Sequence, residues 1–302
     1  MHGLVGVDGS SRPHRYATGR QGAPGGTHSD NILKEKMLKQ EQKDEIHALW
    51  DELADFGAVH AEAACRHLQG RLCQMTGAFN ATWEGATRLG TQPECRGPFE
   101  GWRIPVTQLL HPVDSSRQSA GFKEIQGLWS RGVDAAPHLM LAMRNVGSFR
   151  AYGLRRDMPG EWFDGPFYRN HFACFGIMDS IWIGFPVSQH AESHFGFHSH
   201  ATFGKRDVEL LSYALRGIKW FHRQLMIIQG VLAARSSLTP TERKVLRLLL
   251  TSASEKEISE QLGLAVSTTH QHVVSLFRKF SVRSRAGLMS LWLGDPDHVG
   301  KI

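Results

Sequence analysis

The strongest constraint on the fold lies near the C-terminus, where two helix-start motifs each precede an apolar helical face. Thr239 and Glu242 have the spacing of a capping box, with a proline between them at the first helical position. Ser254 and Glu257 repeat this spacing, and Gly263 stands where a left-handed C-cap would end the second helix. The sequence therefore predicts two consecutive helices joined by a short turn.

Two further helices are predicted after Gly263. One should run from about Ser267 to Phe280 and the other should start after Ser284, each with apolar residues at helical spacing. The second and third predicted helices flank the turn "QLGLA", and the third exposes a polar face, which together is a helix-turn-helix arrangement. We therefore predict an all-α, four-helix domain over residues 235–302.

This segment resembles the DNA-binding domain of the LuxR-type helix-turn-helix regulators. "LTPTERKVLRLL" is similar to the first helix of that family, and "KEISEQLGL" to its scaffold helix and turn. "STTHQHVVSLFRKF", followed by "VRSRA", is similar to the recognition helix and its exit. The resemblance implies a transcription regulator that reads duplex DNA with its third C-terminal helix.

The resemblance also implies which residues contact DNA. Carried over position by position, the base-reading residues are His270, Gln271 and Val274. Glutamine can make paired hydrogen bonds to adenine, and valine can pack on a thymine methyl group. Lysine and threonine supply hydrogen-bond donors to phosphate oxygens. The DNA-backbone contacts that the resemblance implies are Lys256, Thr268, His272 and Lys279.

Three positions depart from the family pattern. His270 stands where the family usually has lysine, and histidine is mostly uncharged at neutral pH. Ala265 replaces the usual serine cap of the recognition helix, a loss of about 1 kcal/mol. Ser252 stands where glycine is common. We expect these differences to affect the target sequence and the affinity, not the fold.

The preceding part of the chain predicts a separate α+β domain over residues 31–234. Two helices come first, followed by short strands bounded by glycine and proline, and the last element is one long amphipathic helix from Asp207 to about Ala234. Residues 168–178 are predicted as a strand and residues 116–129 as a helix. Residues 1–30 are rich in glycine, serine, arginine and histidine, and are predicted to be a disordered tail.

This layout weakly resembles GAF- and PAS-like sensor domains, with an antiparallel sheet, flanking helices and a cavity between them. The resemblance implies that an unidentified small molecule controls the protein. It does not identify the residues that would bind this molecule. An acyl-homoserine-lactone receptor is an alternative, although Trp162, Asp164 and Tyr168 do not have the spacing of that class. A second alternative is a ligand-independent regulator whose N-terminal domain only dimerises.

A histidine-rich stretch within this domain contains residue types that bind metals. His190, His194, His198 and His200 surround Glu192, and neutral imidazoles suit zinc, copper or iron. The stretch is predicted to be a loop or a strand edge, and no cysteine lies near it in the sequence. We therefore expect packing or solvated histidines, with no metal and no cofactor.

Composition narrows the class of protein further. The formal net charge of +6 suits DNA but decides nothing alone, and the four scattered cysteines are typical of reduced thiols in the cytoplasm. No apolar run is long enough to span a bilayer. No phosphate-binding glycine loop, HExxH motif or nucleophile elbow is present, so we expect no enzyme.

The expected partners follow from this interpretation. They are double-stranded DNA, a second copy of the chain and a small molecule, with RNA polymerase as a further candidate and no membrane. The expected dimer contacts are the long exit helix and the fourth C-terminal helix, which carries Leu288, Leu291 and Trp292.

Overall fold

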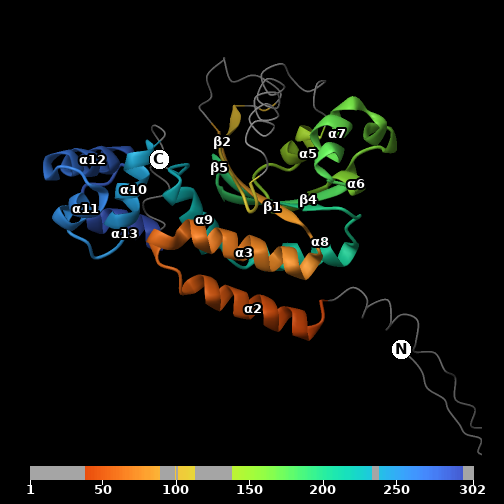
Figure 1. Ribbon diagram of the computed structural model, residues 1–302, viewed down its shortest axis with the longest axis horizontal. Coiled ribbons are helices and arrows are strands. Elements are labelled where there is room, and N and C mark those ends of the chain that lie inside the picture. The colour runs from red at the N-terminus through yellow and green to blue at the C-terminus, as the bar shows by residue number, and fades with distance from the viewer. Residues whose placement is uncertain (1–37, 89–98, 100, 113–137, 233–237, 295–302) are drawn as a thin grey trace, which may run out of the picture. The chain divides into compact units, whose positions relative to one another are not determined.

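The computed structural model describes most of both predicted domains (Figure 1). The described residues are 38–88, 99, 101–112, 138–232 and 238–294. The predicted tail over residues 1–30, the predicted helix over 116–129 and the domain boundary at residue 235 lie outside them. None of the described helices is long and apolar enough to cross a membrane.

An antiparallel sheet of five strands organises the N-terminal part of the described chain, with the strand order β2-β1-β5-β4-β3 (Figure 1). The predicted class, an α+β domain with an antiparallel sheet and flanking helices, is confirmed. The central strand β5 is buried along its whole length and contains His194 and His198, so these two histidines are not in a loop or at a strand edge as expected. His190 and His200 lie just outside the strand, in an exposed turn and an exposed bend. The strands are β1 (Asn80–Arg88), β2 (Trp102–Leu109), β3 (Arg150–Gly153), β4 (Asp179–Ser188) and β5 (Ala191–Ser199).

One face of the sheet builds the main hydrophobic core. Side chains alternate between the two faces along each strand, and Trp83, Phe195 and Ile183 are fully buried on the apolar face. A 3-10 turn, η1 (Ala58–His60), leads from the first of the core helices to the second. The helices that contribute to this core are α2 (Gln40–Ala54), α3 (Ala61–Thr76), α8 (Lys205–Arg216) and α9 (Lys219–Ile228).

The opposite face of the sheet is polar. The strand register places Thr107, Glu84, His194 and Arg150 in one row across the strands, directed to the face away from the main core. Short helical segments lie over this face (Figure 1). They are α5 (Leu139–Met143), α6 (Leu154–Asp157), η4 (Gly160–Asp164), α7 (Pro166–His171) and η5 (Ala173–Phe175).

The predicted long helix from Asp207 to about Ala234 is wrong, because the chain breaks into α8 and α9 at Gly217. The Trp50 ring packs so closely on Gly217 that a Cβ there would lie 2.4 Å from it. Trp50 Nε1 also donates a hydrogen bond to the Ala214 carbonyl at 2.9 Å, and Ile218 leaves the helical conformation (φ −109°, ψ 46°). Both helices bury apolar residues in one core, so the periodicity continues through the break.

The predicted strand over residues 168–178 is also wrong, since this segment forms α7 and η5. Pro166 occupies the first turn of α7, and Gly176 ends η5 with a positive φ of 75°. Tyr168 and Phe172 stack on one another within an aromatic cluster around Trp162, with ring centroids 6.1 Å apart. The aromatic residues that suggested a strand therefore pack between short helices.

The C-terminal domain has the predicted four helices. Both capping boxes form: the Thr239 backbone N–H donates to Glu242 at 2.7 Å, and the Ser254 backbone N–H donates to Glu257 at 2.7 Å. Gly263 has the predicted left-handed conformation, with a φ of +64°. The helices are α10 (Pro240–Leu249), α11 (Glu255–Leu262), α12 (Val266–Lys279) and α13 (Arg285–Leu293).

Candidate nucleic-acid interface and the polar sheet face

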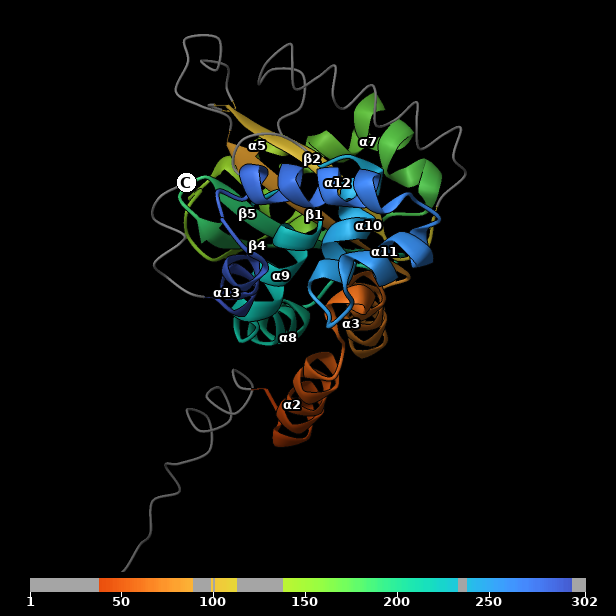
Figure 2. The same cartoon turned by 90° about the vertical axis from the view of Figure 1, so that its left-hand side faces the viewer.

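Helix α12 presents the three predicted base-reading residues on one exposed face. The His270 side chain is 63% exposed, Val274 is 51% exposed, and Gln271 is also exposed. The opposite face of the helix packs Val273 and Leu276 into the domain core. Figure 2 shows α12 turned toward the viewer within the C-terminal helices. A helix buried on one side and exposed on the other can enter a groove without unfolding its domain.

A buried ion pair holds the C-terminal end of α12 against α10. Lys279 Nζ lies 2.7 Å from Glu242 Oε2, and Ser275 Oγ donates to Glu242 Oε1 at 2.8 Å. Burial alone would raise the pKa of Glu242, but hydrogen bonds from Lys279, the Thr239 backbone and Ser275 lower it to about 2. Any phosphate contact by Lys279 would therefore be made beside this carboxylate.

The other predicted phosphate contacts differ in exposure. Lys256 lies in the first turn of α11 with its side chain 78% exposed, and its Nζ is 4.0 Å from Glu260. Thr268 and His272 are half-buried on α12. His270 Nδ1 lies 3.0 Å from Glu255 Oε2, which links the exposed face of α12 to the start of α11.

Positive charge is concentrated in this domain. Residues 236–292 contain eight lysine and arginine residues against four glutamates, one of which is the buried Glu242. Lys244, Lys256, Arg278 and Arg283 are exposed. Such an excess attracts a polyanion and supplies donors to it.

The start of α12 and the end of α10 differ in how their backbone groups are satisfied. Ala265 precedes α12 without a side-chain cap, as the sequence indicated. Arg285, which sequence reasoning missed, donates from Nε to the Leu249 carbonyl and from Nη1 to the Ala253 carbonyl. This guanidinium satisfies a carbonyl group at the C-terminal end of α10 and another in the following loop, so it ties the loop that precedes α11 to the end of α10.

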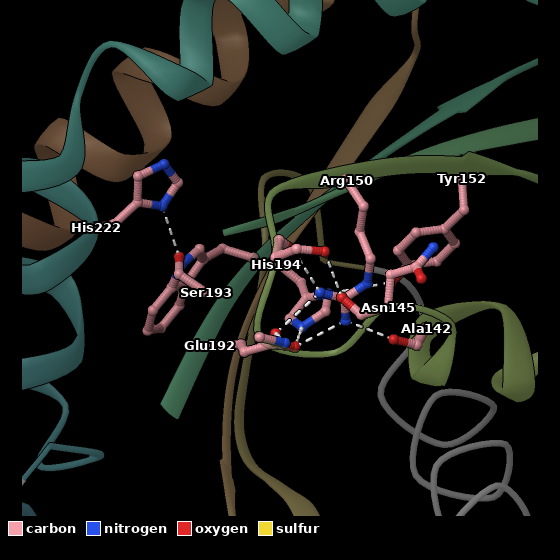
Figure 3. A network of polar contacts seen from close by, with 11 residues as sticks. Ala142, Asn145, Arg150, Tyr152, Glu192, Ser193, His194 and His222 are labelled. Carbon is pink, nitrogen blue, oxygen red and sulfur yellow. Dashed lines mark hydrogen bonds and ion pairs between the residues drawn. The ribbon is translucent and has the colours of Figure 1, made fainter. Parts of the chain in front are cut away.

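A second polar site lies on the polar sheet face. Figure 3 shows the Arg150 guanidinium between Glu192 and the Ala142 carbonyl. Arg150 donates to both Glu192 oxygens, at 2.9 and 2.7 Å, and the Gly147 backbone N–H donates to the same carboxylate at 2.8 Å. The Arg150 and Glu192 side chains are only 9% and 2% exposed. The pair is therefore a bidentate ion pair removed from water.

His194 and Tyr152 complete this network. Although burial would raise the pKa of Glu192, hydrogen bonds from His194 and Arg150 lower it to about 2, so it is an anion at neutral pH. His194 Nε2 therefore donates to Glu192 at 3.0 Å, and its Nδ1 accepts from the Tyr152 hydroxyl at 3.0 Å. Burial lowers the pKa of His194 and raises that of Tyr152, so both groups are neutral.

Two other histidines of the stretch, His198 and His200, contact neighbouring side chains, whereas His190 is exposed. His198 Nε2 lies 2.8 Å from Thr82 Oγ1 and its Nδ1 lies 2.8 Å from Ser180 Oγ, while His200 stacks on Phe79. Both ring nitrogens of His194 and of His198 are thus engaged with protein groups. Within the described ranges no three histidine, cysteine or acidic side chains are grouped so that they could hold a metal ion.

A glycine in β5 sets the shape of this face. The Trp182 ring lies flat over Gly196, where an added Cβ would be 2.7 Å from ring atoms. Trp182 in turn stacks nearly parallel to Tyr152, at an interplanar angle of 7° and a centroid distance of 6.5 Å. The position of the tyrosine in the network therefore depends on a residue with no side chain.

Sequence reasoning found part of the polar site and missed the rest. The histidine-rich stretch drew attention to Glu192 and His194, but Arg150 and Glu84 were not singled out. Glu84 lies on β1 between two residues that are buried in the opposite direction. A glutamate directly after Trp83 within a predicted strand was the available signal, because successive strand residues point to opposite faces and a glutamate beside a core tryptophan therefore lies on the other face.

Comparison with known proteins matches the C-terminal domain. Residues 236–292 match the family described as bacterial regulatory proteins, luxR family. The transcriptional regulatory protein MctR of Rhizobium johnstonii is 40% identical over 65 residues, which are 22% of this chain and 30% of MctR. The probable HTH-type transcriptional regulator GfsR of Streptomyces halstedii is 33% identical over 60 residues, 20% of this chain and 25% of GfsR. The chain thus spans less than a third of either relative.

The solved structures that resemble this chain align with a larger part of it than the two relatives above, but at lower sequence identity. The crystal structure of Escherichia coli SdiA aligns with 82% of this chain and 96% of its own, at 10% sequence identity and a TM-score of 0.41. The VqsR LBD domain from Pseudomonas aeruginosa aligns with 63% of this chain and 98% of its own, at 12% identity and a TM-score of 0.40.

Proposed function

We propose that this chain, whose residues 236–292 carry a domain of the luxR family, is a DNA-binding transcription regulator with a sensor-like N-terminal domain. In this proposal α12 lies in the major groove, and His270, Gln271 and Val274 contact base edges. The observation that carries the proposal is the exposure of these three side chains on a helix whose opposite face is buried. Lys256, Thr268, His272 and Lys279 are the proposed contacts to the DNA backbone.

We also propose that the regulator acts as a homodimer, with half-sites about one helical turn apart on duplex DNA. Leu288 and Leu291 are not available as dimer contacts, because they are buried in the core of the C-terminal domain. Leu293, at the end of α13, is 77% exposed and supports a contact there. RNA polymerase is a further candidate partner of the bound regulator.

Two substitutions are expected to separate base reading from backbone contact. Gln271→Ala should change sequence preference, with a loss of about 1–3 kcal/mol at the base pair that it reads. Lys256→Ala should weaken binding to all sequences about equally and reduce the slope of log affinity against log salt by about 1. Selection of bound sequences from a random duplex pool, followed by binding titrations at several salt concentrations, measures both effects.

The matched control is Lys205→Ala, which removes the same charge from an exposed position at the start of α8. It should leave the sequence preference and the salt slope unchanged. Binding that does not depend on salt would contradict the phosphate contacts. If Gln271→Ala and Lys256→Ala shifted the preference in the same way, the assignment of their roles would be wrong.

A further inference from the structure

One side-chain pair connects the exposed face of α12 to the start of α11. His270, whose side chain is 63% exposed, lies with its Nδ1 3.0 Å from Glu255 Oε2. Within the described ranges, no other group pairs with the Glu255 carboxylate, and none pairs with His270 Nε2. The imidazole is therefore held at one nitrogen, and its other nitrogen is free to contact a ligand.

The position of Glu255 is fixed by the cap of α11. Glu255 is the first residue of this helix and directly follows Ser254, whose side chain accepts a hydrogen bond from the Glu257 backbone N–H at 3.3 Å. The partial positive charge at a helix N-terminus also favours a carboxylate there. A residue held by the start of the scaffold helix thus contacts a base-reading residue of the recognition helix.

The carboxylate determines which nitrogen of the imidazole carries the hydrogen. An ionised carboxylate only accepts hydrogen bonds, so the Nδ1 that faces Glu255 must be the donor. A neutral imidazole has one donor and one acceptor, and its Nε2 is then the acceptor. Free neutral histidine mostly has the opposite arrangement, with the hydrogen on Nε2. Glu255 therefore imposes the less common form of the ring on His270.

An acceptor at this position suits different bases from a lysine. In the major groove guanine presents two acceptors, whereas cytosine and adenine each present an amino group that donates. Lysine, which the LuxR-type family usually has at the position of His270, only donates and suits guanine. A neutral His270 with a free acceptor at Nε2 suits an amino group instead.

We propose that Glu255 is a positioning residue for base recognition: it holds the His270 ring so that Nε2 accepts a hydrogen bond from the amino group of a cytosine or an adenine. The proposal rests on the proposed function, because it names the class of base for one residue of the same site. Contact with DNA removes water from this face, and a hydrogen bond strengthens as the local dielectric falls. The Glu255–His270 pair is therefore stronger in the complex than on the free surface.

The state of the ring can be measured without DNA. In the full chain with isotope-labelled histidine, long-range proton–nitrogen correlation spectra show which ring nitrogen carries the hydrogen, and comparison with His270→Ala assigns the His270 signals. The spectra are recorded at pH 8, where an imidazole is mostly neutral. We expect hydrogen on Nδ1 in the unmodified chain and on Nε2 in Glu255→Gln, because an amide can donate to Nδ1. Glu260→Gln, the same change at another exposed position of α11, should keep the hydrogen on Nδ1.

Base analogues test the contact in the complex. The unmodified chain first selects a duplex from a random pool, and each adenine or cytosine of the bound site is then replaced in turn by purine or pyrimidin-2-one, which lack the amino group. At one position this loss should weaken binding about fivefold, the value of a single hydrogen bond. The same replacement should have no effect on binding by His270→Ala. An effect at the base that Gln271 reads persists in His270→Ala, so the two contacts are distinguished.

Glu255→Gln tests the role of the carboxylate in base preference. This variant should lose the dependence on the amino group and bind guanine at the same position better than the unmodified chain does, because Nε2 then donates. Glu260→Gln should keep the preference of the unmodified chain. Hydrogen on Nε2 of His270 in the unmodified chain, amino-group effects that all persist in His270→Ala, or an unchanged preference in Glu255→Gln would overturn the proposal.

The two measurements keep this proposal distinct from the proposed function. If the chain binds duplex DNA with the expected salt dependence but no amino-group effect depends on His270, the class of base is wrong and the regulator stands. If the chain binds no duplex DNA, the proposed function and the base contact are both wrong, whichever nitrogen of His270 carries the hydrogen.

Discussion

Replacing Arg150 with methionine is expected to lower the free energy of unfolding by about 3–5 kcal/mol. The substitution keeps an unbranched side chain but leaves Glu192, whose side chain is 2% exposed, without its cationic partner. The loss is large because the carboxylate stays buried with only His194 and the Gly147 backbone N–H as donors. Chemical denaturation at neutral pH, followed by circular dichroism, measures the change.

Two comparisons show whether the lost partner causes this effect. Arg144→Met makes the same change at an exposed position after α5 and should cost less than about 0.5 kcal/mol. The double variant Arg150→Met with Glu192→Met removes both charges and should recover most of the lost stability, because a buried ion pair can be replaced by apolar residues at little cost. A double variant as unstable as Arg150→Met would attribute the loss to packing.

Acidification from pH 7.5 to 5 is expected to destabilise the protein through His222, by about 2 kcal/mol. His222 is fully buried: its Nε2 donates to the Leu215 carbonyl at 2.9 Å, and its Nδ1 lies 2.8 Å from Ser193 Oγ. Burial lowers the pKa of His222 to about 4. The unfolded chain takes up a proton below about pH 6.5 and the folded chain does not, so stability is complete above pH 6.5 and is lost as the pH falls toward 4.

The same reasoning applies to His198, whose pKa burial also lowers to about 4. Glu84 changes in the opposite direction, because its raised pKa favours the folded state when it is protonated below about pH 7. The decisive measurement is therefore a comparison of variants. His222→Gln should lose about 2 kcal/mol less between pH 7.5 and 5 than the unmodified chain, whereas His190→Gln, at an exposed position, is the matched control. Equal losses in all three proteins would refute the role of His222.

The C-terminal domain could be predicted closely because its signals are local. Capping boxes at Thr239 and Ser254 and the left-handed Gly263 each act within a few residues, so the sequence around them determines where each helix begins or ends. The exposed face of α12 followed from the period of its apolar residues. The Glu242–Lys279 pair did not follow, because its two residues lie on different helices and meet only when these pack.

The N-terminal domain was predicted in class but not in detail, because its determinants are distant in the sequence. The break between α8 and α9 depends on Trp50, a residue of α2. The polar site joins Glu84 from β1, Arg150 from β3 and Glu192 from β5, and only the strand order β1-β5-β4-β3 brings these residues to one face. The weak resemblance to sensor domains implied a cavity but not which side chains would line it.

The Trp182 ring packs directly on Gly196, so the positions of the side chains on the polar sheet face depend partly on the absence of a side chain at residue 196. A methyl group at position 196 would lift the indole, tilt the tyrosine stacked on it and lengthen the hydroxyl contact to His194. A substitution at position 196 would thus change the polar sheet face without exchanging any ionisable group. Gly196 thus acts, through Trp182 and Tyr152, on the hydrogen bond of His194, which lies two residues earlier in the same strand.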